Sequence, residues 1–275
     1  MSLVKIQPVI DVISLSLQSA FIADELNAIS LILIGPPEVA KTSSIFKFNN
    51  LKFVNYYDEI TAKKIMDEVL PEVKSGKTKF LLVPDLINCI EKQRATREQF
   101  LAILKSGIDD TGIMRISTAY KQLPNLGLVE GLKFSLITAT TIGNFKSIRK
   151  SIKSSGLMSR LLPFSYTYSQ GVVRNVFDLV NGENVSKTDN VVLPEIRQPE
   201  KPVKIRTDPA LLSKLEMVST QMGIAYGGYG IRAHMLLKRL TKANALINDR
   251  DHITKEDINR VIELSNWMNF DCNPL

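Results

Sequence analysis

The feature that most constrains this chain is an apolar run that leads directly into a short loop ending in a Lys-Thr pair. Residues 30–34 read Ser-Leu-Ile-Leu-Ile, and residues 35–42 read Gly-Pro-Pro-Glu-Val-Ala-Lys-Thr. The segment resembles the Walker A pattern G-x-x-x-x-G-K-[ST], whose backbone N–H groups cradle phosphates between a strand and a helix. The sequence therefore predicts a phosphate-binding loop at this position.

The loop departs from the pattern at one position, because Ala40 stands where the second glycine is expected. Glycine there allows backbone geometry and a close approach that a methyl group hinders. The strand, the spacing, Lys41 and Thr42 together still favour ATP as the ligand, with the lysine on the β and γ oxygens and the threonine hydroxyl on Mg²⁺. The predicted nucleotide-binding residues of the loop are Gly35, Pro36, Pro37, Glu38, Val39, Ala40, Lys41, Thr42 and Ser43.

Strand-like and helical segments alternate through the first two thirds of the chain, which is typical of a parallel sheet covered on both faces. This pattern predicts an α/β fold with a doubly wound, parallel, five-stranded sheet. Helices are expected at about 42–50, 61–74, 88–105 and 155–162. The expected strands are Ser30–Ile34, Lys52–Tyr56, Lys79–Val83, Lys133–Ala139 and Phe164–Tyr168.

In the last third of the chain, the alternation of strand-like and helical segments stops. Residues 181–207 contain Gly182 and three prolines among polar residues and predict a linker. Asp208 and Pro209 then open a helical unit, and Thr254 with Asp257 resembles a capping box for its last helix. We therefore expect a nucleotide-binding domain at 1–180, a linker at 181–207 and an all-helical lid at 208–275.

The amino-acid composition indicates the kind of partner and the cellular environment of the protein. A net charge of +7 favours polyanionic partners such as nucleic acid. Two distant cysteines, Cys89 and Cys272, suggest neither a disulfide framework nor a zinc site, and predict a cytoplasmic, reducing environment. The apolar stretch at 8–26 is interrupted by charges, so we expect a packed helix and no membrane span.

A second acidic element follows the apolar run at 80–83. Asp85 ends this predicted strand and is the candidate for supporting Mg²⁺ together with Thr42. In ATPases with a Walker A loop, the residue after this acid is usually a glutamate that polarises the attacking water. Leu86 occupies that place, which puts ATP hydrolysis in question. Glu59, after the second predicted strand, is a reserve candidate for that role. Its alternative interpretation is an acidic residue in a solvent-exposed turn, without a catalytic role.

Taken together, residues 10–264 resemble the AAA+ superfamily of ATPases. The resemblance implies that Thr140 or Thr141 contacts the γ-phosphate or the attacking water, and Thr140 is the residue we select. It implies that Arg160 acts as an arginine finger on a neighbouring subunit, hence a homo-oligomeric ring. It also implies that Arg232, at the start of a lid helix, reaches the nucleotide of its own subunit. The lid itself is similar to those of minichromosome-maintenance helicases and Holliday-junction motors.

Three functions remain open on these residues. The first is a helicase-like motor or loader acting on nucleic acid, and the second is a nucleotide-dependent switch or assembly factor that remodels a protein partner with weak or no hydrolysis. The third is a degenerate relative that scaffolds a complex. Candidate nucleic-acid contacts are Arg115, Lys121, Lys146 and Lys150.

Overall fold

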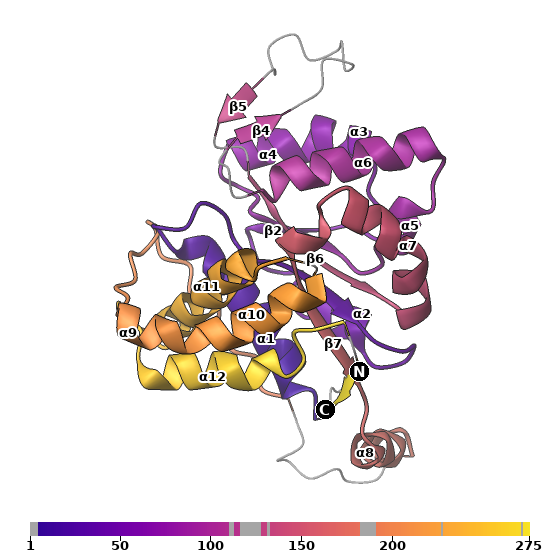
Figure 1. The fold of residues 1–275 in the computed structure, drawn as a ribbon. Helices are drawn as coiled ribbons and strands as arrows, with labels where there is room; N and C mark the ends of the chain where they lie inside the picture. Colours follow the sequence, from indigo (N-terminus) through magenta and orange to yellow (C-terminus); the bar gives the residue numbers. More distant parts are fainter. Residues whose placement is uncertain are drawn as a thin grey trace.

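A computed structural model describes residues 5–109, 113–115, 128–130, 133–181, 191–226, 228–270 and 272–275. Its centre is one parallel sheet in the order β2-β3-β6-β1-β7-β8, flanked by helices (Figure 1). The strands of this sheet are β1 (Ser30–Ile34), β2 (Val54–Tyr56), β3 (Phe80–Val83), β6 (Ser135–Thr140), β7 (Leu161–Thr167) and β8 (Asn273–Pro274).

The central strand β1 is buried on both faces, which explains why its residues 31–34 are all aliphatic. Leu31 and Leu33 face one hydrophobic cluster, and Ile32 and Ile34 face the other. The predicted α/β class is therefore confirmed. The predicted number of strands is wrong, because β8 returns from the C-terminus to pair with β7, and two residues are too few to leave a periodic pattern in the sequence.

Helices cover the two faces unequally. One face packs against α3 (Ala62–Lys64), a π-helical turn at Ile65–Val69, α4 (Leu70–Lys74), α5 (Ile87–Ile90), α6 (Arg94–Gly107) and α7 (Ile142–Ser154). The other face packs against α1 (Gln7–Gln18), α2 (Lys41–Phe46), α10 (Glu216–Tyr226), α11 (Ile231–Ile247) and α12 (Lys255–Ser265). The doubly wound description is thus inexact, since the N-terminal helix and the C-terminal helices supply much of this second layer.

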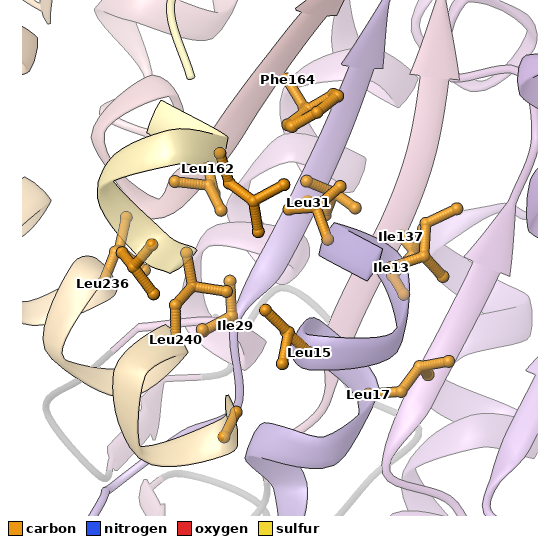
Figure 2. Close-up of a cluster of buried hydrophobic side chains, with 14 of the residues drawn as sticks. Ile13, Leu15, Leu17, Ile29, Leu31, Ile137, Leu162, Phe164, Leu236 and Leu240 are labelled. Carbon is orange, nitrogen blue, oxygen red and sulfur yellow. The ribbon is translucent and has the colours of Figure 1, made fainter. Parts of the chain in front are cut away.

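The second layer meets the sheet through aliphatic side chains. Leu236 and Leu240 of α11 lie against Ile29 and Leu31, beside Leu15 of α1 (Figure 2). Because α11 comes from the C-terminal region, this region is packed into the same core as the sheet.

Two predicted helices have different boundaries. The helix expected at 155–162 does not form, because Gly156 adopts a left-handed φ of 74° that ends α7, and β7 begins at Leu161 after a single 3-10 turn. The helix expected at 88–105 is divided into α5 and α6, and between them Lys92 forms an ion pair with Glu59 at 2.5 Å.

The C-terminal helices begin at the expected caps. The Asp208 carboxylate accepts a hydrogen bond from the Ala210 N–H at 2.9 Å, starting α9 (Pro209–Leu212). Thr254 and Asp257 form the predicted capping box of α12. The division into three domains stays a prediction; residues 191–206 lie near α1, where Gln18 bonds the backbone of Arg197. Among the described helices, none is long and apolar enough to cross a membrane.

A buried ionic cluster attaches α11 to the segment after α1. The Lys242 side chain is fully buried and its Nζ lies 2.5 Å from Asp24 and 2.7 Å from Glu25. Arg239, also buried, donates to the second carboxylate oxygen of Glu25 at 2.8 Å. Breaking such a pair is costly because a charge stays buried without its counter-ion.

We expect Glu25→Ala to lower the free energy of unfolding by about 3–5 kcal/mol, because it removes the carboxylate that Arg239 and Lys242 share. Urea unfolding followed by circular dichroism measures the change. The matched control is Asp251→Ala, which breaks an exposed pair with Arg206 and should cost less than about 1 kcal/mol. Equal costs for the two variants would contradict a structural role for the cluster.

Candidate nucleotide-binding site

A pocket of about 800 Å³ lies at the carboxyl edge of the sheet. Parallel strands end at the same edge, so loops distant in sequence meet there. The pocket is lined by the loop after β1, by the residues that follow β3, β6 and β7, and by α8 (Gln170–Val180). Its lining residues are Pro37, Glu38, Val39, Ala40, Lys41, Thr42, Ser43, Pro84, Asp85, Thr140, Thr141, Tyr168, Val176, Leu179 and Val180.

The predicted phosphate loop adopts two left-handed backbone positions, Glu38 with φ 68° and Ala40 with φ 56°. Ala40 is the N-cap of α2, and its carbonyl accepts a hydrogen bond from the Ser44 N–H at 2.9 Å. A non-glycine residue in this region costs about 1–2 kcal/mol. Alanine thus adopts the backbone conformation that glycine would take readily, at the expense of local strain.

Gly35, the first residue of the loop, is held close to β7. A Cβ atom at this position would lie 2.6 Å from the backbone oxygen of Tyr166, so only glycine fits. The Tyr166 hydroxyl in turn donates to the carbonyl of Val39 at 2.8 Å. Burial raises the pKa of Tyr166 well above its ordinary value, which keeps this hydroxyl protonated as a donor. Strand β7 therefore contacts the loop at Gly35 and at Val39.

Lys41 lies inside the curve of the loop. Its Nζ donates to the carbonyls of Gly35 at 2.9 Å and Pro36 at 2.5 Å. Burial lowers the pKa of Lys41, and the electrostatic influence of Cys272 and Asp85 acts in the opposite direction. The ammonium group is thus positioned beside the pocket by backbone oxygens and is near Asp85.

The donors that line the pocket suit Mg²⁺. Thr42 offers a hydroxyl and Asp85 a carboxylate, and Mg²⁺ is commonly held by one or two carboxylates together with substrate phosphates. Within the part of the chain that the structure describes, no group of three His, Cys, Asp or Glu side chains could hold a metal alone.

The remaining catalytic candidates differ in their surroundings. Thr140 lines the pocket, while the Thr141 hydroxyl accepts from the Asn144 N–H at 3.2 Å as the N-cap of α7. Leu86 is fully buried. Glu59 does not line the pocket; it pairs with Lys92. Asp85 and Glu38 are the carboxylates among the lining residues.

The two candidate arginines lie elsewhere. Arg160 donates to Asp109 at 2.8 Å and to the carbonyl of Gly156 at 2.6 Å, and its side chain is 10% exposed. Arg232 donates to the hydroxyl of Ser159 at 3.1 Å. Residues 159 and 160 precede β7, whose first residue pairs with the first residue of β1, so both arginines lie near the edge of the sheet opposite the pocket.

The candidate nucleic-acid contacts are dispersed. Arg115 belongs to β4 (Ile113–Arg115), which pairs with β5 (Leu128–Glu130) in a separate antiparallel sheet. Lys121 lies outside the described residues. Lys146 and Lys150 are exposed on α7. A groove of about 300 Å³ between α6 and α7 adds Arg97 and Lys105 to this side of the molecule.

Five pocket residues were not predicted from the sequence: Pro84, Tyr168, Val176, Leu179 and Val180. Pro84 lies directly before the predicted Asp85, after the end of β3. Tyr168 follows β7, and the topology that brings β7 beside β1 also brings Tyr168 to the pocket. The other three lie on α8, whose aliphatic residues recur at helical spacing. That periodicity was visible in the sequence, but it does not specify what the helix faces.

The loop at 35–42 lies between β1 and α2 at the carboxyl edge of a parallel α/β sheet, which is the place that phosphate-binding loops occupy in P-loop nucleotide-binding proteins. Residues 219–265, which span most of α10 through α12, match a family model described as AAA lid domain. This match supports an AAA+ ATPase. No curated protein matches the chain significantly. The finer similarity to minichromosome-maintenance and Holliday-junction lids stays a prediction.

Substitutions at the two ends of the loop should have opposite outcomes. We expect Gly35→Ala to weaken ATP binding by at least about tenfold, since the new methyl group collides with the backbone of Tyr166. Ala40→Gly should retain or improve ATP binding because it removes the left-handed strain. Titration with a fluorescent ATP analogue measures both. Weaker binding by Ala40→Gly would show that the methyl group itself contributes to the site.

Proposed function

We propose that this chain is an ATP-binding AAA+ ATPase that holds ATP and Mg²⁺ in the pocket at the carboxyl edge of the sheet. The observation that supports this most is the convergence of the loop at 35–42 with Asp85 and Thr140 around one pocket. Residues 1–180 would bind the nucleotide, and the helices at 208–275 would form the lid.

The pocket suggests a role for each lining group. Lys41 would donate to the β- and γ-phosphates, and Thr42 and Asp85 would hold Mg²⁺. Mg²⁺ bound there would neutralise part of the negative charge of the phosphates. Thr140 would orient the γ-phosphate or the attacking water. Because Leu86 is a buried hydrocarbon side chain, it supplies no base, and we expect hydrolysis to be slow.

The positions of the two arginines favour an oligomer. Arg160 and Arg232 are distant from their own pocket but close to each other, since Arg232 bonds to the residue before Arg160. Arg160 would therefore act on the pocket of a neighbouring subunit, as a ring allows. Arg232 was expected to reach the nucleotide of its own subunit, but its bond to Ser159 leads us to propose that it too acts on the neighbour. Arg160 would first have to exchange Asp109 for the neighbour's phosphate.

Nucleic acid is our first choice of partner. Helix α7 carries Lys146, Arg149, Lys150 and Lys153 and no acidic residue, and the chain has a net charge of +7. The second candidate, a switch that remodels a protein partner, is supported by Leu86, which leaves the site without the usual base. The two functions differ in whether nucleic acid stimulates turnover.

ATP turnover with and without DNA tests the proposal. We expect Lys41→Ala to weaken ATP binding by about tenfold or more, because it removes charge-assisted hydrogen bonds to the phosphates. Single-stranded or duplex DNA should raise wild-type turnover, and Lys146→Glu combined with Lys150→Glu should lose the stimulation but keep ATP affinity. ATP binding without DNA stimulation would favour the switch. Wild-type protein that binds no ATP would refute both.

Mixing two inactive variants tests the action of Arg160 across subunits. Arg160→Ala keeps its own pocket and should bind ATP but lose turnover, whereas Lys41→Ala keeps its arginine. Mixed oligomers contain some interfaces with an intact pocket and an intact Arg160, so a mixture should recover part of the phosphate release. A mixture as inactive as its two components, in oligomers shown by native mass spectrometry to be mixed, would contradict the role.

A further inference from the structure

Most of the net positive charge of the chain lies on α6 and α7, two helices that cover the same face of the sheet (Figure 1). Helix α6 carries three basic residues and one acid, and α7 carries four basic residues and no acid. Their combined charge is +6, whereas the whole chain has a net charge of +7. Such a concentration of one sign of charge attracts polyanions.

A groove of about 300 Å³ lies between these two helices. Residues four positions apart are neighbours on a helix surface, so Arg97, Leu101 and Lys105 form one row along the α6 side of the groove. The α7 side is formed by serines near the end of that helix. The lining residues of this α6–α7 groove are Arg97, Glu98, Leu101, Ala102, Lys105, Ser151, Ser154 and Ser155.

The groove offers two rows of groups that can donate to phosphates. Arg97 and Lys105 are eight residues apart, which corresponds to about 12 Å along the axis of α6. One strand of a DNA duplex carries a phosphate about every 3.4 Å along the duplex axis, so this row faces about three or four phosphates. On α7, Lys146, Lys150 and Ser154 form a second row. Serine hydroxyls, like lysine and arginine side chains, are common donors to phosphate oxygens.

The basic residues of the two rows are not neutralised by neighbouring acids. Within the part of the chain that the structure describes, none of the four forms an ion pair. The one carboxylate that lines the groove belongs to Glu98, and it pairs with Arg94 at 2.8 Å. The groove therefore keeps a positive charge that a phosphate backbone would neutralise.

We propose that the α6–α7 groove binds the phosphate backbone of a nucleic-acid duplex, independently of base sequence. The inference deepens the proposed function and rests on its choice of nucleic acid as the partner. The described residues that line the groove include no aromatic ring, whereas binding sites for single strands stack the bases on aromatic side chains. A duplex keeps its bases stacked inside and presents its phosphates outside, which suits a groove of cations and hydroxyls.

A negative charge placed in the groove tests the proposal without removing a cation. The test variant is Ala102→Glu, at an exposed position of α6 where glutamate is compatible with the helix. The matched control is Thr96→Glu, which makes the same change of charge at another exposed position of α6. Thr96 does not line the groove and lies about 120° around the helix axis from Ala102.

A second pair of variants removes cations. Arg97→Gln with Lys105→Gln takes two charges from the groove. Its control is Lys214→Gln with Lys255→Gln, which takes two charges from exposed lysines of the C-terminal region. Fluorescence anisotropy of the full chain with a labelled duplex of about 20 base pairs, at several salt concentrations and without nucleotide, gives each Kd and its salt dependence.

We expect Ala102→Glu to raise the Kd for the duplex by about fivefold or more, and Thr96→Glu to change it by less than about twofold. The groove double variant should also reduce the slope of log K against log salt by about 2, because each phosphate contact contributes about 0.9. The lysine control should leave this slope unchanged. A single strand of the same length should bind the wild-type protein more weakly than the duplex.

Four results would overturn the inference, provided that circular dichroism shows each variant to be folded. Equal effects of Ala102→Glu and Thr96→Glu would show that only net charge matters. Unchanged duplex affinity in both groove variants would show that the duplex lies elsewhere, and tighter binding of the single strand would exclude a duplex site. Wild-type protein that binds ATP but no DNA would refute the groove and favour the switch. Duplex binding by wild-type protein that binds no ATP would instead refute the ATPase and leave the groove supported.

Discussion

The position of β1 between β6 and β7 is the constraint on which the candidate site depends. β1 pairs with β6 from Leu31 to Ile34 and with β7 from Ser30 to Ile34, so it is fixed on both sides. The loop after β1 therefore begins against the backbone of Tyr166, and the end of β6 delivers Thr140 to the same edge. Displacing β1 would disturb the loop, its support and the pocket together.

The C-terminal helices share this dependence because they belong to the same core. Leu236 and Leu240 of α11 pack beside β1 and α1, and the ionic cluster of Lys242 and Arg239 with Glu25 orients the helix. The chain then returns to the sheet as β8, which places Cys272 near the carbonyl of Ile34 at the start of the loop. The region that matches the AAA lid is thus connected to the phosphate loop by packing as well as by sequence.

The sheet also separates two kinds of functional candidate. Its carboxyl edge carries the phosphate loop, Asp85 and Thr140, and its opposite edge carries Arg160 and Arg232. A single subunit therefore holds its arginines away from its own pocket. This geometry explains why we assign them to a neighbouring subunit.

The sequence by itself determined the α/β class, the five longer strands to within a few residues, the caps of the C-terminal helices and the position of the predicted phosphate loop between β1 and α2. These features depend on local periodicity and on the types and spacing of residues that are close together in the sequence, such as Gly35, Lys41 and Thr42. Only the tertiary structure decided the strand β8, the left-handed backbone of Ala40, the ion pair of Arg160 and the position of α8 beside the pocket. Each of these depends on contacts between segments far apart in the sequence, and no local pattern specifies which segments meet.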